Sequence, residues 1–159
     1  MPAVTTVGTP RLADVGDAAE VAQLLHDFNI EFDTPSPGSA VLRERLATLL
    51  AGPSLFALLH GAPAVAVAVV SLRPNVWHPG PVALLEELYV APDHRDRGIG
   101  SSLLALLRGL VVSRGCGAIE INVDEGDVDA QRFYERHGYT RIQPDTGEQA
   151  YYYSQELPQ

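Results

Sequence analysis

Apolar residues recur along the chain with two different spacings, and the spacing changes from one segment to the next. Positions repeating every three or four residues predict a helix over about residues 17–31, with Asp17 as its N-cap. The same spacing predicts a second helix over residues 39–51, which Gly52 and Pro53 end. A third helix follows residue 100, with a broad apolar face that includes Leu103 and Leu107.

Shorter apolar segments between these helices predict strands. They cover residues 4–15, 54–60, 64–72, 82–90 and 119–123. A short helix is expected over residues 129–137, closed by Gly138, and final strands over 139–142 and 149–157. Strands and helices in this order indicate an α/β fold with one central mixed β-sheet flanked by about four helices. A length of 159 residues predicts one domain, 1–159.

Composition limits the cellular location and the partners that we expect for this domain. The longest apolar run, residues 62–70, is too short to span a bilayer, and the first residues lack the features of a signal peptide. A single cysteine, Cys116, excludes an internal disulfide and favours the reducing cytoplasm. A net charge of −9 argues against a nucleic-acid partner. It agrees equally with solubility alone and with attraction of a cationic substrate.

The segment between residues 84 and 104 carries the clearest chemistry. Glu86 and Glu87 lie on a predicted strand, and Arg95-x-x-Gly98-x-Gly100 follows at the start of the apolar helix. Backbone N–H groups and the helix dipole favour an anion at such a helix start. A Walker A loop is excluded because the chain has no lysine, and a dinucleotide fingerprint lacks its third glycine, since Leu103 stands there.

The anion-binding pattern resembles a known signature. Arg-x-x-Gly-x-Gly preceded by Leu88-Tyr-Val-Ala-Pro92 resembles the acetyl-CoA motif of the GNAT superfamily of N-acetyltransferases. Residues 119–139 resemble the second motif of that family, with Tyr134 in its aromatic pair and a Gly-aromatic ending. Asp127 stands where the family usually has an asparagine that contacts the cofactor. An ionised carboxylate cannot donate that bond, so Asp127 is either a cofactor contact or only a helix cap.

The resemblance implies a GNAT fold, in which two parallel strands splay apart and acetyl-CoA, the co-substrate, enters the gap. It implies Glu86 as a base acting through water, Glu87 as the substrate ammonium contact, and Tyr134 as proton donor to the CoA sulfur. Strand alternation would put the two glutamates on opposite faces, unless the bulge that the family shows near residues 88–90 redirects one. Trp77 is a candidate wall of the substrate pocket. The implied cofactor contacts are Leu88, Tyr89 and Val90 through their main chain, and Arg95, Arg97, Gly98, Ile99, Gly100 and Ser101 around the pyrophosphate.

The resulting hypothesis is an acetyl-CoA-dependent N-acetyltransferase that uses direct attack by a primary amine in a ternary complex. The expected acceptor is a small cationic amine such as a polyamine, an aminoglycoside or an amino-acid derivative. The alternatives are a protein N-terminal or lysine acetyltransferase and a CoA-binding sensor without activity. Histidines are dispersed without metal-ligand spacing, so no metal is expected. The expected partner is a small-molecule amine, and neither a nucleic acid nor a membrane is expected to bind. A homodimer is left open.

Overall fold

A computed structural model describes residues 8–159, and the chain divides into two compact units. The first unit ends at Ile121 and contains the sheet with three α-helices. The second begins at Asn122 and contains one α-helix, α4 (Val128–Arg136). The element order is that of an α/β fold, as the sequence predicts.

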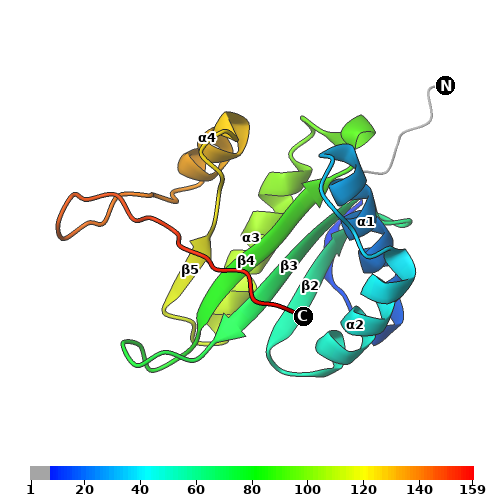
Figure 1. Cartoon of the computed structure of the whole chain (residues 1–159), viewed down its shortest axis with the longest axis horizontal. Helices are drawn as coiled ribbons and strands as arrows, with labels where there is room; N and C mark the ends of the chain where they lie inside the picture. The colour runs from blue at the N-terminus through cyan, green and yellow to red at the C-terminus, as the bar shows by residue number, and fades with distance from the viewer. Residues whose placement is uncertain (1–7) are drawn as a thin grey trace. The chain divides into compact units, whose positions relative to one another are not determined.

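The sheet of the first unit has five strands in the order of the sequence (Figure 1). They are β1 (Pro10–Leu12), β2 (Leu55–His60), β3 (Ala66–Arg73), β4 (Val82–Val90) and β5 (Ala118–Ile121). The first four pair antiparallel, and β4 pairs parallel with β5. The prediction of one mixed sheet is confirmed.

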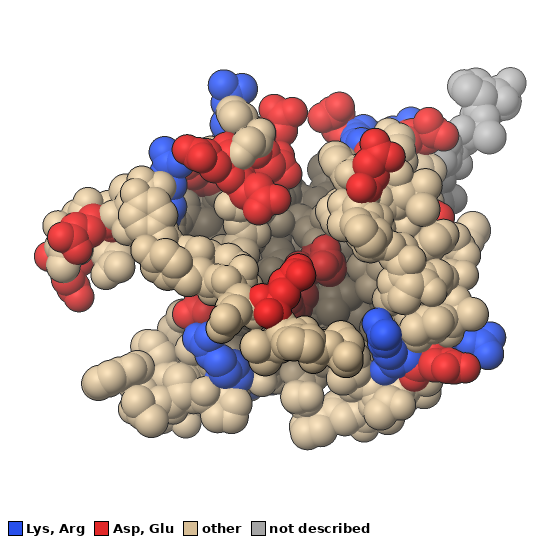
Figure 2. Space-filling model, in the orientation of Figure 1, with Lys and Arg blue, Asp and Glu red and all other residues tan. Residues whose placement is uncertain are grey.

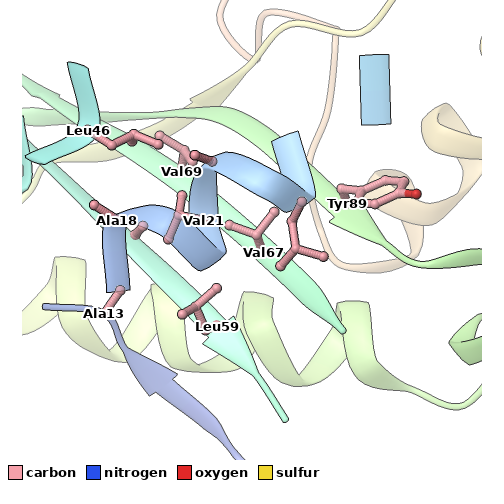
Figure 3. Close-up of a cluster of buried hydrophobic side chains, with 11 residues drawn as sticks. Ala13, Ala18, Val21, Leu46, Leu59, Val67, Val69 and Tyr89 are labelled. Atoms are coloured by element: carbon pink, nitrogen blue, oxygen red, sulfur yellow. The ribbon is translucent and has the colours of Figure 1, made fainter. Parts of the chain in front are cut away.

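Helices cover both faces of this sheet. The helices α1 (Ala18–Glu31) and α2 (Ser39–Ala51) lie on one face and α3 (Ile99–Ser113) on the other (Figure 1). Val21 of α1 and Leu46 of α2 join Leu59, Val67 and Val69 of the sheet in one buried cluster (Figure 3). Full burial of such a side chain contributes about 1.5–3 kcal/mol. This cluster therefore fixes the face of the sheet to which α1 and α2 pack.

The register between β3 and β4 contains a bulge. Val69 pairs with Glu87 and Val70 with Leu85, so Glu86 is an extra residue without a partner in β3. Pairing from Leu88 to Val90 is regular, so the expectation of a bulge near residues 88–90 is wrong. The extra residue interrupts the ladder earlier, between Leu85 and Glu87.

The parallel pairing between β4 and β5 stops just before the bulge, because β5 ends there. Pairing of β4 with β5 ends at Leu85 and Ile121, although β4 continues to Val90. No other strand of the described residues pairs with this edge of β4 beyond Leu85. Five residues at the end of β4 therefore have one edge without a partner strand.

The C-terminal strands predicted over 139–142 and 149–157 are absent from the described chain. A single bridge joins Ile142 to Gln149. Tyr151, Tyr152 and Tyr153 are 73%, 72% and 88% exposed. These side chains bury no face against a sheet, which is what stabilises apolar and aromatic residues in a strand.

Asp17 occupies the N-cap position of α1, as predicted, but it does not cap the helix through its side chain. The Asp17 side chain makes no capping bond to α1 and accepts instead from the Asp14 N–H, at 2.9 Å, and from Arg11. A short 3₁₀ turn, Val15–Asp17, precedes the helix, and Asp14 caps it by accepting from the Gly16 N–H. Of the strand predicted over 4–15, the structure contains only β1, Pro10–Leu12, and residues 4–7 lie outside the described range.

Candidate active site

Glu86 and Glu87 lie on the same face of the sheet. The Ser71 hydroxyl donates to Glu86 Oε1 at 2.7 Å, and Glu87 stands opposite Val69. Val69 and Ser71 are two positions apart on β3, so their side chains share the face that α1 and α2 cover. The bulge therefore gathers two carboxylates that regular alternation would separate.

The two carboxylates differ in their surroundings. Burial raises the pKa of the Glu87 carboxyl, and the neighbouring charge of Glu86 raises it further. Glu86 is exposed and accepts the Ser71 hydrogen bond. One carboxyl group of the pair is therefore half-buried with a raised pKa, whereas the other is open to solvent.

The unpaired edge of β4 presents backbone donors beside these carboxylates. The Ala91 N–H donates to the Val65 carbonyl at 2.9 Å, so Ala91 is hydrogen-bonded toward β3. Backbone groups of successive strand residues point to alternate edges. The N–H groups of Leu88 and Val90 therefore point to the edge of β4 that has no partner strand. The Val90 carbonyl, on the same edge, accepts from Arg95 Nε at 3.0 Å.

The start of α3 has the geometry of an anion site. Gly98, its N-cap, has a φ of +78°, and no side chain caps the helix. The N–H groups of the first turn, including those of Ile99 and Gly100, have no partner within an α-helix. Asp96, two residues earlier, also has a positive φ, +60°. The loop thus turns sharply to present the start of a 15-residue helix.

The two arginines of the predicted cradle have different environments. Arg95 Nη2 donates to both oxygens of Glu31, at 2.8 and 2.7 Å, so its charge is already paired. Arg97 is exposed, and residues 8–159 contain no ion pair that involves it. Arg97 is therefore the unpaired cation next to the start of α3.

Trp77 lies on the loop between β3 and β4, and its side chain is 87% exposed. Asn75 organises this loop by accepting from the backbone N–H groups of Trp77 and His78, at 2.9 and 2.8 Å.

The second unit holds the two remaining candidates. The ring of Tyr134, on α4, lies 5.2 Å from that of Phe133 and 5.8 Å from that of Tyr139. The Asp127 side chain accepts from the Ala130 N–H at 3.0 Å and caps α4. The capping role considered for Asp127 is therefore present.

Sequence reasoning missed Ser71 and Glu31, which contact the predicted site residues. Ser71 is an ordinary residue of a strand, and Glu31 lies 64 residues before Arg95, so no local pattern marks either contact. No cluster of three or more residues that could hold a metal ion occurs in residues 8–159. No helix in the same range is long and apolar enough to cross a membrane.

The chain is similar to known proteins in sequence and in structure. The model of the acetyltransferase (GNAT) family matches residues 19–139. An aminoglycoside N(6')-acetyltransferase type 1 from Serratia marcescens is 30% identical over 113 residues, covering 69% of this chain and 77% of that protein. A solved structure from Arthrobacter sp. FB24, assigned as an acetyltransferase, is 54% identical with a TM-score of 0.89, covering 96% of this chain and 98% of that one.

A more distant structure shares the fold. It is an aminoglycoside acetyltransferase from an uncultured soil metagenomic sample, solved in complex with sisomicin. It is 19% identical with a TM-score of 0.77, covering 94% of this chain and 96% of that chain.

Proposed function

Because the chain belongs to the acetyltransferase (GNAT) family, we propose that it transfers an acetyl group from acetyl-CoA to a primary amine. The observation that carries this proposal is the placement of Glu86 and Glu87 on one face of β4. The same strand offers unpaired backbone donors where it leaves β5. An acceptor amine and a thioester brought together there would have a base and an oxyanion site within reach.

The start of α3 is the proposed site of the cofactor pyrophosphate. Its first-turn amides, at Ile99 and Gly100, and the exposed Arg97 supply positive potential. The N–H groups of Leu88 and Val90 would stabilise the negative charge that develops on the thioester oxygen. Acetyl-CoA supplies the acetyl group and a thiolate leaving group.

Attack requires a neutral amine, although a free alkylamine has a pKa near about 10.4. Glu86 is the proposed base, acting through water, because it is exposed and resembles the base carboxylate of related enzymes. The Ser71 hydroxyl holds its carboxylate in place. The Tyr134 hydroxyl would then protonate the departing CoA sulfur.

Glu87 is a second candidate for the base. Its raised pKa brings it closer to the operating pH, which favours proton transfer, whereas Glu86 would then hold the substrate ammonium. If Glu86 is the base, Glu86→Gln removes it; if Glu87 is the base, Glu87→Gln does. The activity of each variant can be measured.

The proposed acceptor is a small cationic amine, with aminoglycosides as the first class to test. Two observations support this choice: the similarity to the Serratia marcescens aminoglycoside acetyltransferase and the net charge of −9. Polyamines and amino-acid derivatives carry the same primary amine and form the rest of the panel, together with peptides.

The experiment measures thiol release from acetyl-CoA with that panel, and then pH–rate profiles for the best amine. With Glu86 as base, Glu86→Gln lowers turnover, and its remaining rate climbs more steeply with pH because only deprotonated amine reacts. Glu87→Gln then mainly raises the apparent KM. Glu120→Gln, at an exposed ion pair on β5, is the control and keeps the wild-type profile.

If Glu87→Gln instead lowered turnover and Glu86→Gln mainly raised the apparent KM, Glu87 would be the base. Wild-type profiles in both would exclude these carboxylates from proton transfer. Acetyl-CoA binding without thiol release for any amine or peptide would favour the sensor alternative. Absence of any acetyl-CoA binding would refute the proposed function.

A further inference from the structure

Glu31, the last residue of α1, contacts two residues near the proposed cofactor site. Its Oε1 accepts from the Tyr89 hydroxyl at 3.0 Å, and both its oxygens accept from Arg95 Nη2. The carboxylate thus joins α1 to β4 and to the loop that precedes α3. Charge-assisted hydrogen bonds of this kind are stronger and shorter than neutral ones.

Arg95 is held from three sides. Besides the two bonds to Glu31, its Nε donates to the Val90 carbonyl at 3.0 Å, and its guanidinium carbon lies 5.8 Å from the centre of the Tyr89 ring. The bond to Val90 closes the loop over residues 91–94 upon itself. The contact with Glu31 ties that closed loop to α1.

The other members of this contact are firmly packed. Tyr89 is only 5% exposed, and its ring stacks edge-on against Phe28 of α1 at 5.0 Å. Burial and the hydrogen bond to Glu31 raise the pKa of Tyr89 to about 12, so its hydroxyl remains a donor. Glu31 therefore rests against a fixed partner on one side and holds the loop arginine on the other.

The position of this contact links two parts of the proposed site. Glu31 directly precedes the connection from α1 to α2, residues 32–38, on the face of the sheet that bears Glu86 and Glu87. Arg95 directly precedes the turn in which Asp96 and Gly98 take positive φ and present the start of α3. A movement of either segment would be transmitted to the other through one ion pair.

We propose that Glu31 is a positioning residue: through Arg95 it fixes the loop that presents the start of α3 to acetyl-CoA, and it couples that loop to the acceptor side of the sheet. This inference rests on the proposed function. It assigns Arg95 a structural role in place of the phosphate contact expected from the sequence, and it leaves phosphate attraction to Arg97 and the helix amides.

The test compares Glu31→Gln, Arg95→Met and the double variant in calorimetric binding of acetyl-CoA and in steady-state kinetics. Each single variant should raise the Kd for acetyl-CoA about tenfold, the effect of losing one charge-assisted hydrogen bond. The double variant should be no worse than the poorer single variant, because both remove the same contact. The KM for acetyl-CoA should rise, whereas kcat at saturating acetyl-CoA should change less than about twofold.

Glu120→Gln is the matched control, since it breaks an exposed pair in which Arg73 Nη2 contacts both carboxylate oxygens of Glu120, at 3.2 and 3.1 Å. It should leave the Kd unchanged. If Arg95 were a phosphate ligand, Glu31→Gln would free its charge and tighten binding, whereas Arg95→Met would weaken it. Opposite signs for the two single variants would overturn the proposal, and so would additive losses.

Hydrogen exchange of the loop amides in the unliganded protein tests whether the Glu31–Arg95 contact holds the loop when no cofactor is bound. Glu31→Gln should speed exchange at the His94 and Arg95 amides, which donate to the Ala91 and Pro92 carbonyls, and Glu120→Gln should not. Unchanged exchange would refute the positioning role. If the wild-type protein failed to bind acetyl-CoA but its loop amides exchanged slowly, the proposed function would be refuted. The Glu31–Arg95 contact would still be supported as the group that holds the loop.

Discussion

His60 is a buried histidine at the end of β2, 2% exposed, and its Nδ1 has no hydrogen-bond partner among the described residues. Burial lowers its pKa from the usual value of 6.5. The folded protein therefore keeps this ring neutral at a pH where the unfolded chain binds a proton. Protonation of His60 therefore costs the folded protein no stability above about pH 6.5. Below that pH, the free energy of unfolding should fall as the pH drops toward the pKa of His60 in the folded protein.

Replacement of His60 by leucine should flatten this part of the stability profile. The measurement is the unfolding free energy from urea titrations between pH 5 and 8, in wild type and His60→Leu. His78→Gln, at an exposed histidine, is the control and should retain the wild-type slope. An equally steep fall in His60→Leu would show that other groups govern the acid sensitivity.

Tyr134→Phe tests the proposed proton donor, because it keeps the ring among Phe133 and Tyr139 and removes only the hydroxyl. Turnover should fall by about 10²-fold, a typical contribution of general acid catalysis. Acetyl-CoA affinity should change little. Unchanged turnover, in conditions where chemistry limits the rate, would leave Tyr134 with a packing role.

The turn into α3 depends on a left-handed glycine. Gly98→Ala places a Cβ at a φ of +78°, which costs roughly 1–2 kcal/mol, although no atom lies within 4 Å of that Cβ. We expect a lower Tm and weaker acetyl-CoA binding, because relief of this strain would rotate the first-turn amides. Calorimetry and thermal melts measure both effects.

Gly109→Ala, in the exposed middle of the same helix, is the matched control for this substitution. It adds the same methyl group where nothing lies within 4 Å and no positive φ is required. It should stabilise the protein by about 0.5–1 kcal/mol and leave acetyl-CoA binding unchanged. Equal effects at both positions would show that the left-handed turn is not the cause.

Elements with a clear apolar period and punctuating residues were predictable from the sequence. The second helix was expected over 39–51 and found there, between Gly38 and Gly52, and β4 was expected over 82–90 and found as Val82–Val90. The predictions of C-terminal strands were wrong because aromatic and apolar residues in one segment do not provide a neighbouring strand. Sheet pairing is a tertiary property that the pattern of one segment does not contain.

Candidate site residues could be named from the sequence, but their relative geometry could not. Glu86 and Glu87 were recognised as candidates, whereas their common face depends on one skipped partner between Val69 and Val70. Arg95 was named as a phosphate ligand, but its pairing with Glu31, 64 residues away, was not foreseen. A contact of that separation leaves no trace in local spacing.

The whole chain is acidic, with 20 acidic and 11 basic residues, and carboxylates are more prominent than basic groups on the face drawn in Figure 2. A cationic acceptor should be attracted by this field, and salt should screen the attraction. The KM for an amine with several positive charges should therefore rise between low and high ionic strength. The KM for a singly charged amine should rise much less. Equal salt dependence for both would remove the electrostatic argument for the acceptor.

The bulge at Glu86 is equivalent to a one-residue insertion into an otherwise regular strand. If Glu86 were deleted, Leu85 and Glu87 would become neighbours, and each would keep its present partner on β3, Val70 and Val69. Side chains would then alternate along β4 without interruption. The insertion of one codon into an ordinary strand is thus enough to add a second carboxylate to this face, while every other pairing in the sheet is preserved.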